Sequence, residues 1–155
     1  STLISVLSSA RPKIANYPFT TLIPNLGVVR KSDGNGCLFA DIPGLISGAA
    51  EGVGLGHDFL RHIQRTKIII HLIDSIAENP IHDFEIIEKE LKRYGSGLLN
   101  KERIVVLNKM ELVDENYLQT ITKKLENLSK KKVLVISSSL RKGLSPLLSE
   151  VWNRI

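Results

Sequence analysis

The chain has 155 residues; 21 are Lys or Arg and 16 are Asp or Glu, which gives a formal net charge of +5. Hydrophobic residues make up 43% of it, enough for one folded domain, so a disordered chain is excluded. The single cysteine excludes an internal disulfide framework and favours a reducing, cytoplasmic location. No apolar stretch approaches the ~20 residues that cross a bilayer, so no membrane span is expected.

The first part of the chain predicts a short helix, an irregular segment and a hairpin. Leu3, Ile4 and Leu7 lie on one face of a helix that is under way at the first residue. Three prolines predict an irregular segment over 11–24. Two apolar runs separated by turn-forming residues predict a β-hairpin with strands at 26–30 and 37–42. A glycine-rich loop over 43–56 and a helix that starts near His57 are expected to follow.

Strand and helix patterns alternate along the rest of the chain. Continuous apolar runs, typical of strands covered on both faces, lie at 68–73, 104–107 and 133–136. Amphipathic segments that predict helices lie at 81–94, 115–128 and 144–154. Repeated strand–helix units predict an α/β fold with a parallel sheet and helices on both faces. Ligands of such sheets bind beyond the carboxyl ends of the strands, so the residues after each strand are the candidate site.

Two segments are suited to phosphate and metal. The helix that begins at Ser1-Thr2 offers free amides and a positive dipole end. Ser1 occupies the place of the hydroxyl that coordinates Mg²⁺ in the phosphate-loop motif, although the glycines and lysine of that motif are absent. The second hairpin strand is followed by Asp41-Ile42-Pro43-Gly44. An aspartate there suits Mg²⁺ held through water and a glycine admits a phosphate oxygen, although ordinary turns use the same residues.

Two further segments are suited to a purine base. The second parallel strand is followed by Asn108-Lys109-Met110-Glu111. The carboxylate can accept two hydrogen bonds from one purine edge and the lysine stem can cover the base; the same residues also fit a polar helix cap. The third parallel strand is followed by Ser137-Ser138-Ser139, small residues that let backbone amides reach a base carbonyl but that also fit a plain loop.

Taken in chain order, these segments resemble the guanine-nucleotide-binding domain of translation-factor-related GTPases. Residues 16–27 resemble the first switch of the Obg family (also called CgtA), and residues 41–56 are similar to its second switch. The resemblance covers essentially the whole chain and is densest over 15–65. It implies a P-loop NTPase (Ras-like) three-layer fold, with one OBG-type G domain over 1–155.

The resemblance also implies the activity. It predicts a monomeric, Mg²⁺-dependent switch that binds GTP and GDP, hydrolyses GTP and acts in maturation of the large ribosomal subunit. One strand of ~5–6 residues and about seven residues of the phosphate-binding motif are expected before Ser1. That strand is expected between the strands at 37–42 and 68–73. We therefore expect the 155-residue chain by itself to be unstable and to bind nucleotide poorly.

The residue roles follow from the same resemblance. The predicted Mg²⁺ ligands are Ser1, Thr21 and, through water, Asp41. Thr2 is expected near the α-phosphate, and Thr21 with the Gly44 amide forms the predicted catalytic pair that responds to the γ-phosphate. The complete predicted nucleotide-binding set is Ser1, Thr2, Phe19, Thr20, Thr21, Leu22, Ile23, Asp41, Ile42, Pro43, Gly44, Asn108, Lys109, Met110, Glu111, Ser137, Ser138 and Ser139.

Two departures from common GTPase patterns bear on the activity. Glu111 stands where the family usually has Asp, which lengthens the base-reading side chain; one branch of Obg relatives altered in this motif prefers ATP. Leu45 stands where many GTPases place a water-orienting glutamine, so slow intrinsic hydrolysis is predicted. The alternatives to the GTP switch are an ATP-preferring relative and a non-hydrolysing module that docks on the ribosome.

Overall fold

The computed structural model describes residues 2–7, 13–14, 25–30, 36–40, 66–94 and 101–155, and the structural statements below concern these residues. Its elements are α1 (Thr2–Leu7), β1 (Lys13–Ile14), β2 (Asn25–Arg30), β3 (Gly36–Ala40), β4 (Ile68–Asp74), α3 (Pro80–Tyr94), β5 (Glu102–Asn108), the 3₁₀ helix η3 (Met110–Leu112), α4 (Glu115–Ser129), β6 (Val133–Val135) and α5 (Leu144–Arg154). No helix among these segments is long and apolar enough to cross a membrane.

The parallel sheet has the order β4-β5-β6, and β5 is its central strand. β4 and β5 pair in one unbroken register from Ile68 opposite Glu102 to Asp74 opposite Asn108. β6 pairs with the other edge of β5, where Val133 lies opposite Val105. Because parallel strands end at a common edge, this register brings the residues that follow all three strands close together.

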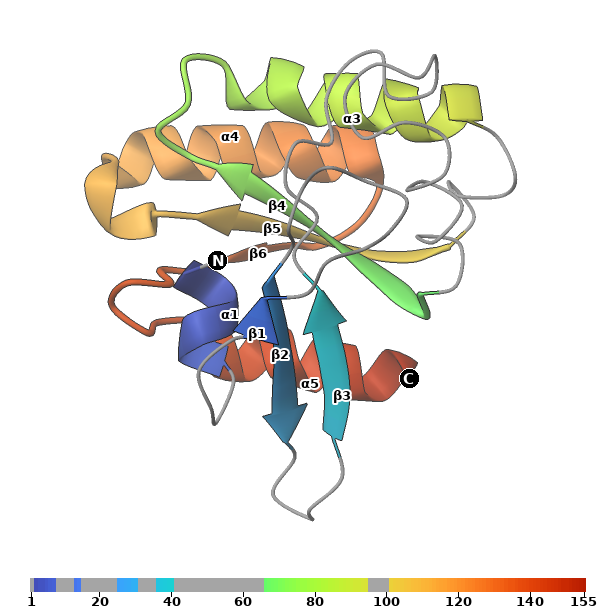
Figure 1. The fold of residues 1–155 in the computed structure, drawn as a ribbon. Helices are drawn as coiled ribbons and strands as arrows, with labels where there is room; N and C mark the ends of the chain where they lie inside the picture. Colours follow the sequence, from blue (N-terminus) through green and yellow to red (C-terminus); the bar gives the residue numbers. More distant parts are fainter. Residues whose placement is uncertain (1, 8–12, 15–24, 31–35, 41–65, 95–100) are drawn as a thin grey trace.

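Helices cover both faces of this sheet, as the alternating pattern predicts. On one face, α3 and α4 cover the strands (Figure 1), and Phe84, Leu125 and Leu107 are buried in this layer. On the other face, α1 and α5 pack around Val106 and Leu147. Val106, Leu107 and Leu147 have no exposed surface, so β5 is sandwiched between two apolar layers. This arrangement confirms the predicted α/β class.

The N-terminal strands form a second, antiparallel sheet in the order β1-β2-β3. β2 and β3 are the predicted hairpin, with Val29 opposite Cys37. The described part of the segment expected to be irregular contains a short strand, because Lys13 pairs with Leu26 of β2. Within the described segments, no strand pairing joins β3 to β4. Cys37 and Phe39 of β3 nevertheless pack against the same apolar cluster as α5.

β4 is less enclosed than its sequence predicts. Its run of six apolar or aromatic residues is typical of a strand covered on both faces, but Leu72 is 42% exposed. Strand alternation places Leu72 on the same face as Ile68 and Ile70, which pack beside the cluster of α1 and α5. Leu72 lies beyond that cluster, so the expectation of burial on both faces is wrong at the carboxyl end of β4.

Local sequence signals fix where two of the helices begin. Asn79 accepts a hydrogen bond through its side chain from the N–H of His82 (3.1 Å), and Pro80 supplies the first residue of α3. Asp114 caps α4 by accepting from the N–H groups of Asn116 and Tyr117. The segment at 108–111 opens the 3₁₀ helix η3, where Lys109 occupies the N-cap position without a side-chain cap bond, and Asp114 is the residue that caps α4.

A half-buried charged cluster joins α3 to the sheet. The carboxylate of Glu88 forms an ion pair with Arg103 of β5, and one of its oxygens lies 3.4 Å from Nδ1 of His71 in β4. Burial opposes ionisation of Glu88, but its interactions with His71 and Arg103 outweigh that effect and hold its pKa below the ordinary 4.5. The ionised carboxylate thus compensates a guanidinium that is itself largely covered.

This cluster predicts an acid-dependent contribution to stability. Because the pKa of Glu88 is lower in the folded chain, its contribution is present above the ordinary value of 4.5 and is lost as pH falls through the native pKa. We expect Glu88→Gln to lower the free energy of unfolding by about 1–2 kcal/mol at neutral pH. The deficit should shrink below about pH 4.5, as measured by urea unfolding at several pH values.

Glu85→Gln is the matched control, because Glu85 lies on the same helix and is exposed. Its unfolding curve should stay within about 0.5 kcal/mol of the wild type. A Glu88→Gln deficit that keeps its full size down to pH 3 would contradict the assignment.

Candidate functional site

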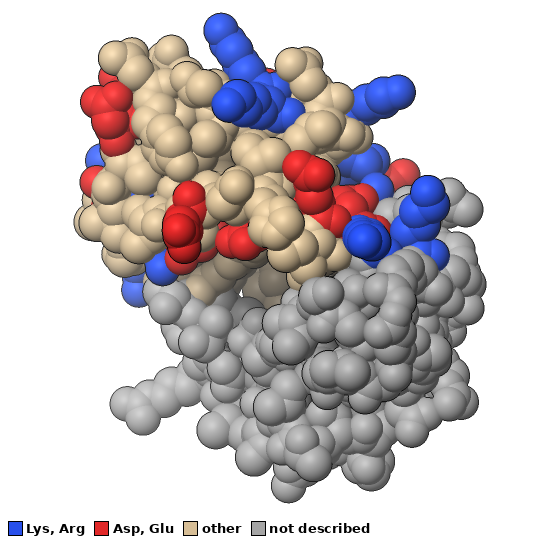
Figure 2. Space-filling view, turned by 90° about the horizontal axis from the view of Figure 1, so that it is seen from above, with Lys and Arg blue, Asp and Glu red and all other residues tan. Residues whose placement is uncertain are grey.

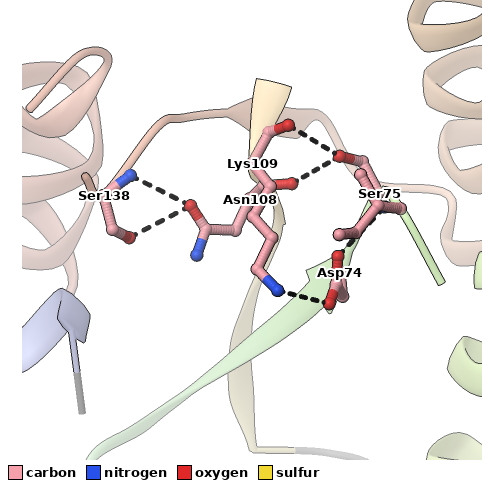
Figure 3. Close-up of polar contacts among 6 residues, drawn as sticks. Asp74, Ser75, Asn108, Lys109 and Ser138 are labelled. Atoms are coloured by element: carbon pink, nitrogen blue, oxygen red, sulfur yellow. Dashed lines mark hydrogen bonds and ion pairs between the residues drawn. The ribbon is translucent and has the colours of Figure 1, made fainter. Parts of the chain in front are cut away.

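The carboxyl edge of the parallel sheet holds a connected set of polar contacts from the ends of β4, β5 and β6 (Figure 3). Asn108 is the last residue of β5, and its side-chain oxygen accepts hydrogen bonds from the backbone N–H and the hydroxyl of Ser138, both at 3.0 Å. Ser138 is only 2% exposed. One amide side chain therefore ties the loop after β5 to the loop after β6.

The chain reverses direction directly after Asn108. Lys109 adopts the left-handed conformation (φ 65°, ψ 35°), which a non-glycine residue rarely takes. Its carbonyl oxygen accepts from the N–H of Leu112 (3.0 Å), and the N–H of Met110 donates to the carbonyl oxygen of Ile136, the residue that follows β6 (3.2 Å). The turn that presents Glu111 is thus held on both sides by backbone bonds.

The end of β4 contributes two further residues to this edge. Asp74 forms an ion pair with the amino group of Lys109 (2.8 Å), in which both side chains are about two-fifths exposed (42% and 41%). The hydroxyl of Ser75 donates to the carbonyl oxygens of Asn108 (2.6 Å) and Lys109 (3.1 Å). Ser75 has no exposed surface. β4 therefore braces the turn from the side opposite Ser138 (Figure 3).

Glu111 lies on the outer side of the turn and is exposed to solvent. It accepts a hydrogen bond from the hydroxyl of Ser139 (2.8 Å). The N–H of its own backbone, with the hydroxyls of Ser137 and Ser139, lowers the pKa of Glu111 below the ordinary 4.5. At neutral pH this edge therefore presents an ionised carboxylate that can accept N–H donors from a ligand.

The loop after β6 is held in a compact turn. The backbone of Ser137 exchanges two hydrogen bonds with Lys142, both at 3.0 Å. The hydroxyl of Ser137 also accepts from the N–H of Leu140 (3.1 Å). Arg141 and Gly143 both have positive φ, 57° and 75°, which lets the chain turn back into α5. These bonds fix the serine triplet beside Asn108 and Glu111.

The structure thus brings together the base-directed half of the predicted site. The segments that begin at Asn108 and Ser137 meet through the contacts of Asn108 and Glu111. The phosphate- and metal-directed half lies outside the described residues, apart from the backbone of Thr2 at the start of α1. The residues outside are Ser1, Phe19, Thr20, Thr21, Leu22, Ile23, Asp41, Ile42, Pro43, Gly44 and Leu45. In the described part of the chain, no group of three or more His, Cys, Asp or Glu residues is placed to hold a metal ion.

Sequence reasoning missed Asp74 and Ser75. The same rule that selected the other segments applies to them, because both come at the end of a strand of the parallel sheet. An aspartate followed by a serine carries no motif of its own, and nothing in the sequence shows that β4 ends beside Asn108. The register of β4 on β5 is what places them there.

A small cavity of about 130 Å³ lies elsewhere, lined by residues that include Arg103, Lys131 and Arg154. Arg103 is already paired with Glu88, and Arg154 with Glu102 and Glu150. These pairs neutralise much of the positive charge of the cavity. The carboxyl edge of the sheet, where unlike groups from three strands converge, remains the candidate site.

The family of the chain follows from comparison with known proteins. A family model described as "50S ribosome-binding GTPase" matches residues 1–109. The match covers well over half of the chain and includes β4 and β5, ending one residue after β5. The chain therefore belongs to the 50S ribosome-binding GTPase family.

Within that family, the chain is similar to proteins named GTPase Obg, as the switch segments predict. It is 97% identical over 155 residues to the GTPase Obg of Prochlorococcus marinus subsp. pastoris. It is 90% identical over the same length to that of Prochlorococcus marinus strain MIT 9515. Each match covers the whole of this chain but 47% of the relative, so the chain spans about half the length of these curated relatives.

A solved structure shows the same fold. The cytosolic domain of the T. maritima FeoB iron transporter, in its GMPPNP form, matches with a TM-score of 0.73 over 98% of this chain and 57% of that one. The two sequences are only 19% identical, so this likeness concerns the fold alone. It agrees with the three-layer fold predicted from the sequence.

Proposed function

We propose that the chain is the nucleotide-binding part of a monomeric, cytoplasmic, Mg²⁺-dependent switch that binds GTP and hydrolyses it to GDP. The observation that carries this proposal is the joined edge of the sheet, where Asn108 holds Ser138 and Glu111 contacts Ser139. Membership of the 50S ribosome-binding GTPase family supports the same activity.

The chemistry of this edge suits guanine. Glu111 offers carboxylate oxygens, and guanine presents two adjacent N–H donors on one edge, its ring N1–H and its 2-amino group. Charge-assisted hydrogen bonds of this kind are stronger than neutral ones. The backbone amides of the serine triplet are suited to the base carbonyl, and the stem of Lys109 is suited to covering the base. The side chain of Glu111 is one methylene longer than that of the aspartate that the family usually has, so its carboxylate lies further from the backbone of the turn.

The phosphate half of the proposed site relies on the resemblance to the Obg family. Ser1, Thr21 and Asp41, the last through water, would hold Mg²⁺, which when bound neutralises phosphate charge. Thr21 and the Gly44 amide would bind near the γ-phosphate and release after hydrolysis, which is the proposed switch. Leu45 has no hydrogen-bonding group to orient water, so slow hydrolysis is part of the proposal.

The proposed partner is the large ribosomal subunit. The description of the matching family supports it, and the net charge of +5 is compatible with a partner that contains RNA. Seen from the side of α3 and α4, both basic and acidic side chains lie on the described part of the surface (Figure 2). No patch of one sign dominates that part of the face.

Nucleotide titration tests the proposal. The protein should carry whatever residues naturally flank 1–155, and fluorescent GDP should be displaced by GTP, GDP and ATP with and without Mg²⁺. Displacement by GTP and GDP, strengthened by Mg²⁺ and resistant to ATP, is the expected result. Equal displacement by ATP would instead assign an ATP-preferring relative. Absence of binding would favour a non-hydrolysing module, and ribosome pelleting would then test docking.

Thr21→Ala tests the switch half of the proposed site. It should lower the rate of GTP hydrolysis by at least about tenfold while GDP affinity changes less than about twofold, because the hydroxyl is proposed to act only with the γ-phosphate. Single-turnover phosphate release measures the rate, and displacement of fluorescent GDP measures the affinity.

Thr120→Ala is the matched control. Thr120 is an exposed residue of α4 whose hydroxyl bonds to the backbone of Asn116, and its removal should leave the hydrolysis rate unchanged. Rapid turnover that is insensitive to Thr21→Ala would contradict the proposed role.

A further inference from the structure

We propose that Ser75 is a positioning residue of the nucleotide site: its buried hydroxyl holds the backbone of the turn after β5 and so sets how strongly the site prefers guanine. The inference rests on the proposed nucleotide-binding function. It goes beyond that function by assigning base selectivity to a residue that touches neither base nor phosphate in the proposal.

The contacts of Ser75 all converge on the first two residues of the turn. Its hydroxyl donates to the carbonyl oxygen of Asn108 at 2.6 Å and to that of Lys109 at 3.1 Å. Its backbone N–H also donates to Asn108, at 3.2 Å. A hydroxyl has one hydrogen, so the two carbonyls share it. Ser75 is fully buried, and water cannot readily replace these bonds.

The geometry that these bonds hold is an uncommon one. Lys109 has φ 65° without being a glycine, so the neighbouring structure must maintain this conformation. The Lys109 carbonyl accepts from Leu112 as well as from Ser75, and this bond closes the 3₁₀ turn that contains Glu111. The hydroxyl therefore connects the end of β4 to the peptide group that begins the turn of the base-reading carboxylate.

Asp74 does not share this role. Its ion pair with Lys109 joins two side chains that are each about two-fifths exposed, and exposed ion pairs contribute little. Its side chain holds the lysine amino group and the N–H of Ile76, neither of which belongs to the backbone of the turn after β5. Ser75 acts on the backbone itself, where a small rotation at Lys109 displaces the carboxylate of Glu111. The selectivity of the site should therefore depend on Ser75.

The test compares GDP with inosine diphosphate, which lacks the 2-amino group that guanine offers to the carboxylate. In the protein with its natural flanking residues, Ser75→Ala should weaken GDP binding by about fivefold, the equivalent of one hydrogen bond. Inosine diphosphate should lose less, so the ratio of the two affinities should fall by at least about twofold. Titration calorimetry measures both affinities.

Ser149→Ala is the matched control, because Ser149 is exposed on α5; its affinity ratio should equal that of the wild type. Ser75→Cys supplies a second variant of similar size with a weak donor, and its ratio should fall as in Ser75→Ala. If Ser75→Ala left the ratio of the two affinities unchanged, whether or not both affinities fell, the inference would be overturned and the proposed function would stay intact. A wild-type protein that binds neither nucleotide would overturn both.

Discussion

Asn108→Ala should lower the affinity for guanine nucleotides by at least about 30-fold. The substitution removes the acceptor for two hydrogen bonds from Ser138, whose backbone N–H is buried. Losing these bonds and leaving a buried donor unpaired costs about 2 kcal/mol or more. The loops after β5 and β6 would then no longer be held together in the form that accepts a base.

Displacement of fluorescent GDP measures this effect, and melting of the nucleotide-free protein separates it from unfolding. Asn127→Ala is the matched control, since Asn127 is exposed on α4 and its removal should change affinity less than about twofold. If Asn108→Ala bound GDP as tightly as the control, the joined edge of the sheet would not be the base site.

Gly143→Ala is expected to be the most destabilising single substitution in the loop after β6. Gly143 has φ +75°, and a Cβ there would lie 2.5 Å from the carbonyl oxygen of Val135 and 3.1 Å from a side-chain carbon of Ile136. The first contact is with backbone, so relief requires β6 or α5 to move. The left-handed conformation and this clash together should cost about 3 kcal/mol.

For a chain of this size, that loss corresponds to a fall of about 10 °C in melting temperature. Arg141→Gly is an informative counterpart, because Arg141 also has positive φ (57°) and its exposed side chain blocks no backbone. That change should leave stability equal or slightly higher. Equal melting temperatures for Gly143→Ala and the wild type would show that α5 is free to shift away from β6.

Periodicity predicted the parallel part of the fold well. The apolar runs became β4, β5 and β6, and α5 spans the predicted 144–154. The prediction succeeded because these elements are buried and buried faces carry the apolar residues that make the periodicity visible. β5 and the inner faces of α3, α4 and α5 supply most of the fully buried side chains. β1 was missed because its two residues, Lys13 and Ile14, depend on pairing with β2 and follow a proline.

The candidate site could be predicted from the sequence where its residues directly follow a predicted strand of the parallel sheet. Asn108, Glu111 and the serine triplet were selected as candidates because strand ends and a motif coincide there, and the structure brings them together. Two properties depend on tertiary contacts that no local pattern contains. The sequence around Lys109 has no glycine that would signal a left-handed residue, and Ser75 reaches Asn108 across 33 positions of the chain. Both depend on the register of β4 and β5.

β5 is the only described strand of the parallel sheet with a partner on each side and apolar layers on both faces. Such a strand opens last, so its amide hydrogens should be the slowest of this sheet to exchange with solvent. Asn108 ends this strand, and the turn after it is hydrogen-bonded to both neighbouring strand ends. The half of the site that is proposed to contact the base is thus ordered before any ligand arrives, and binding there should lose little conformational entropy.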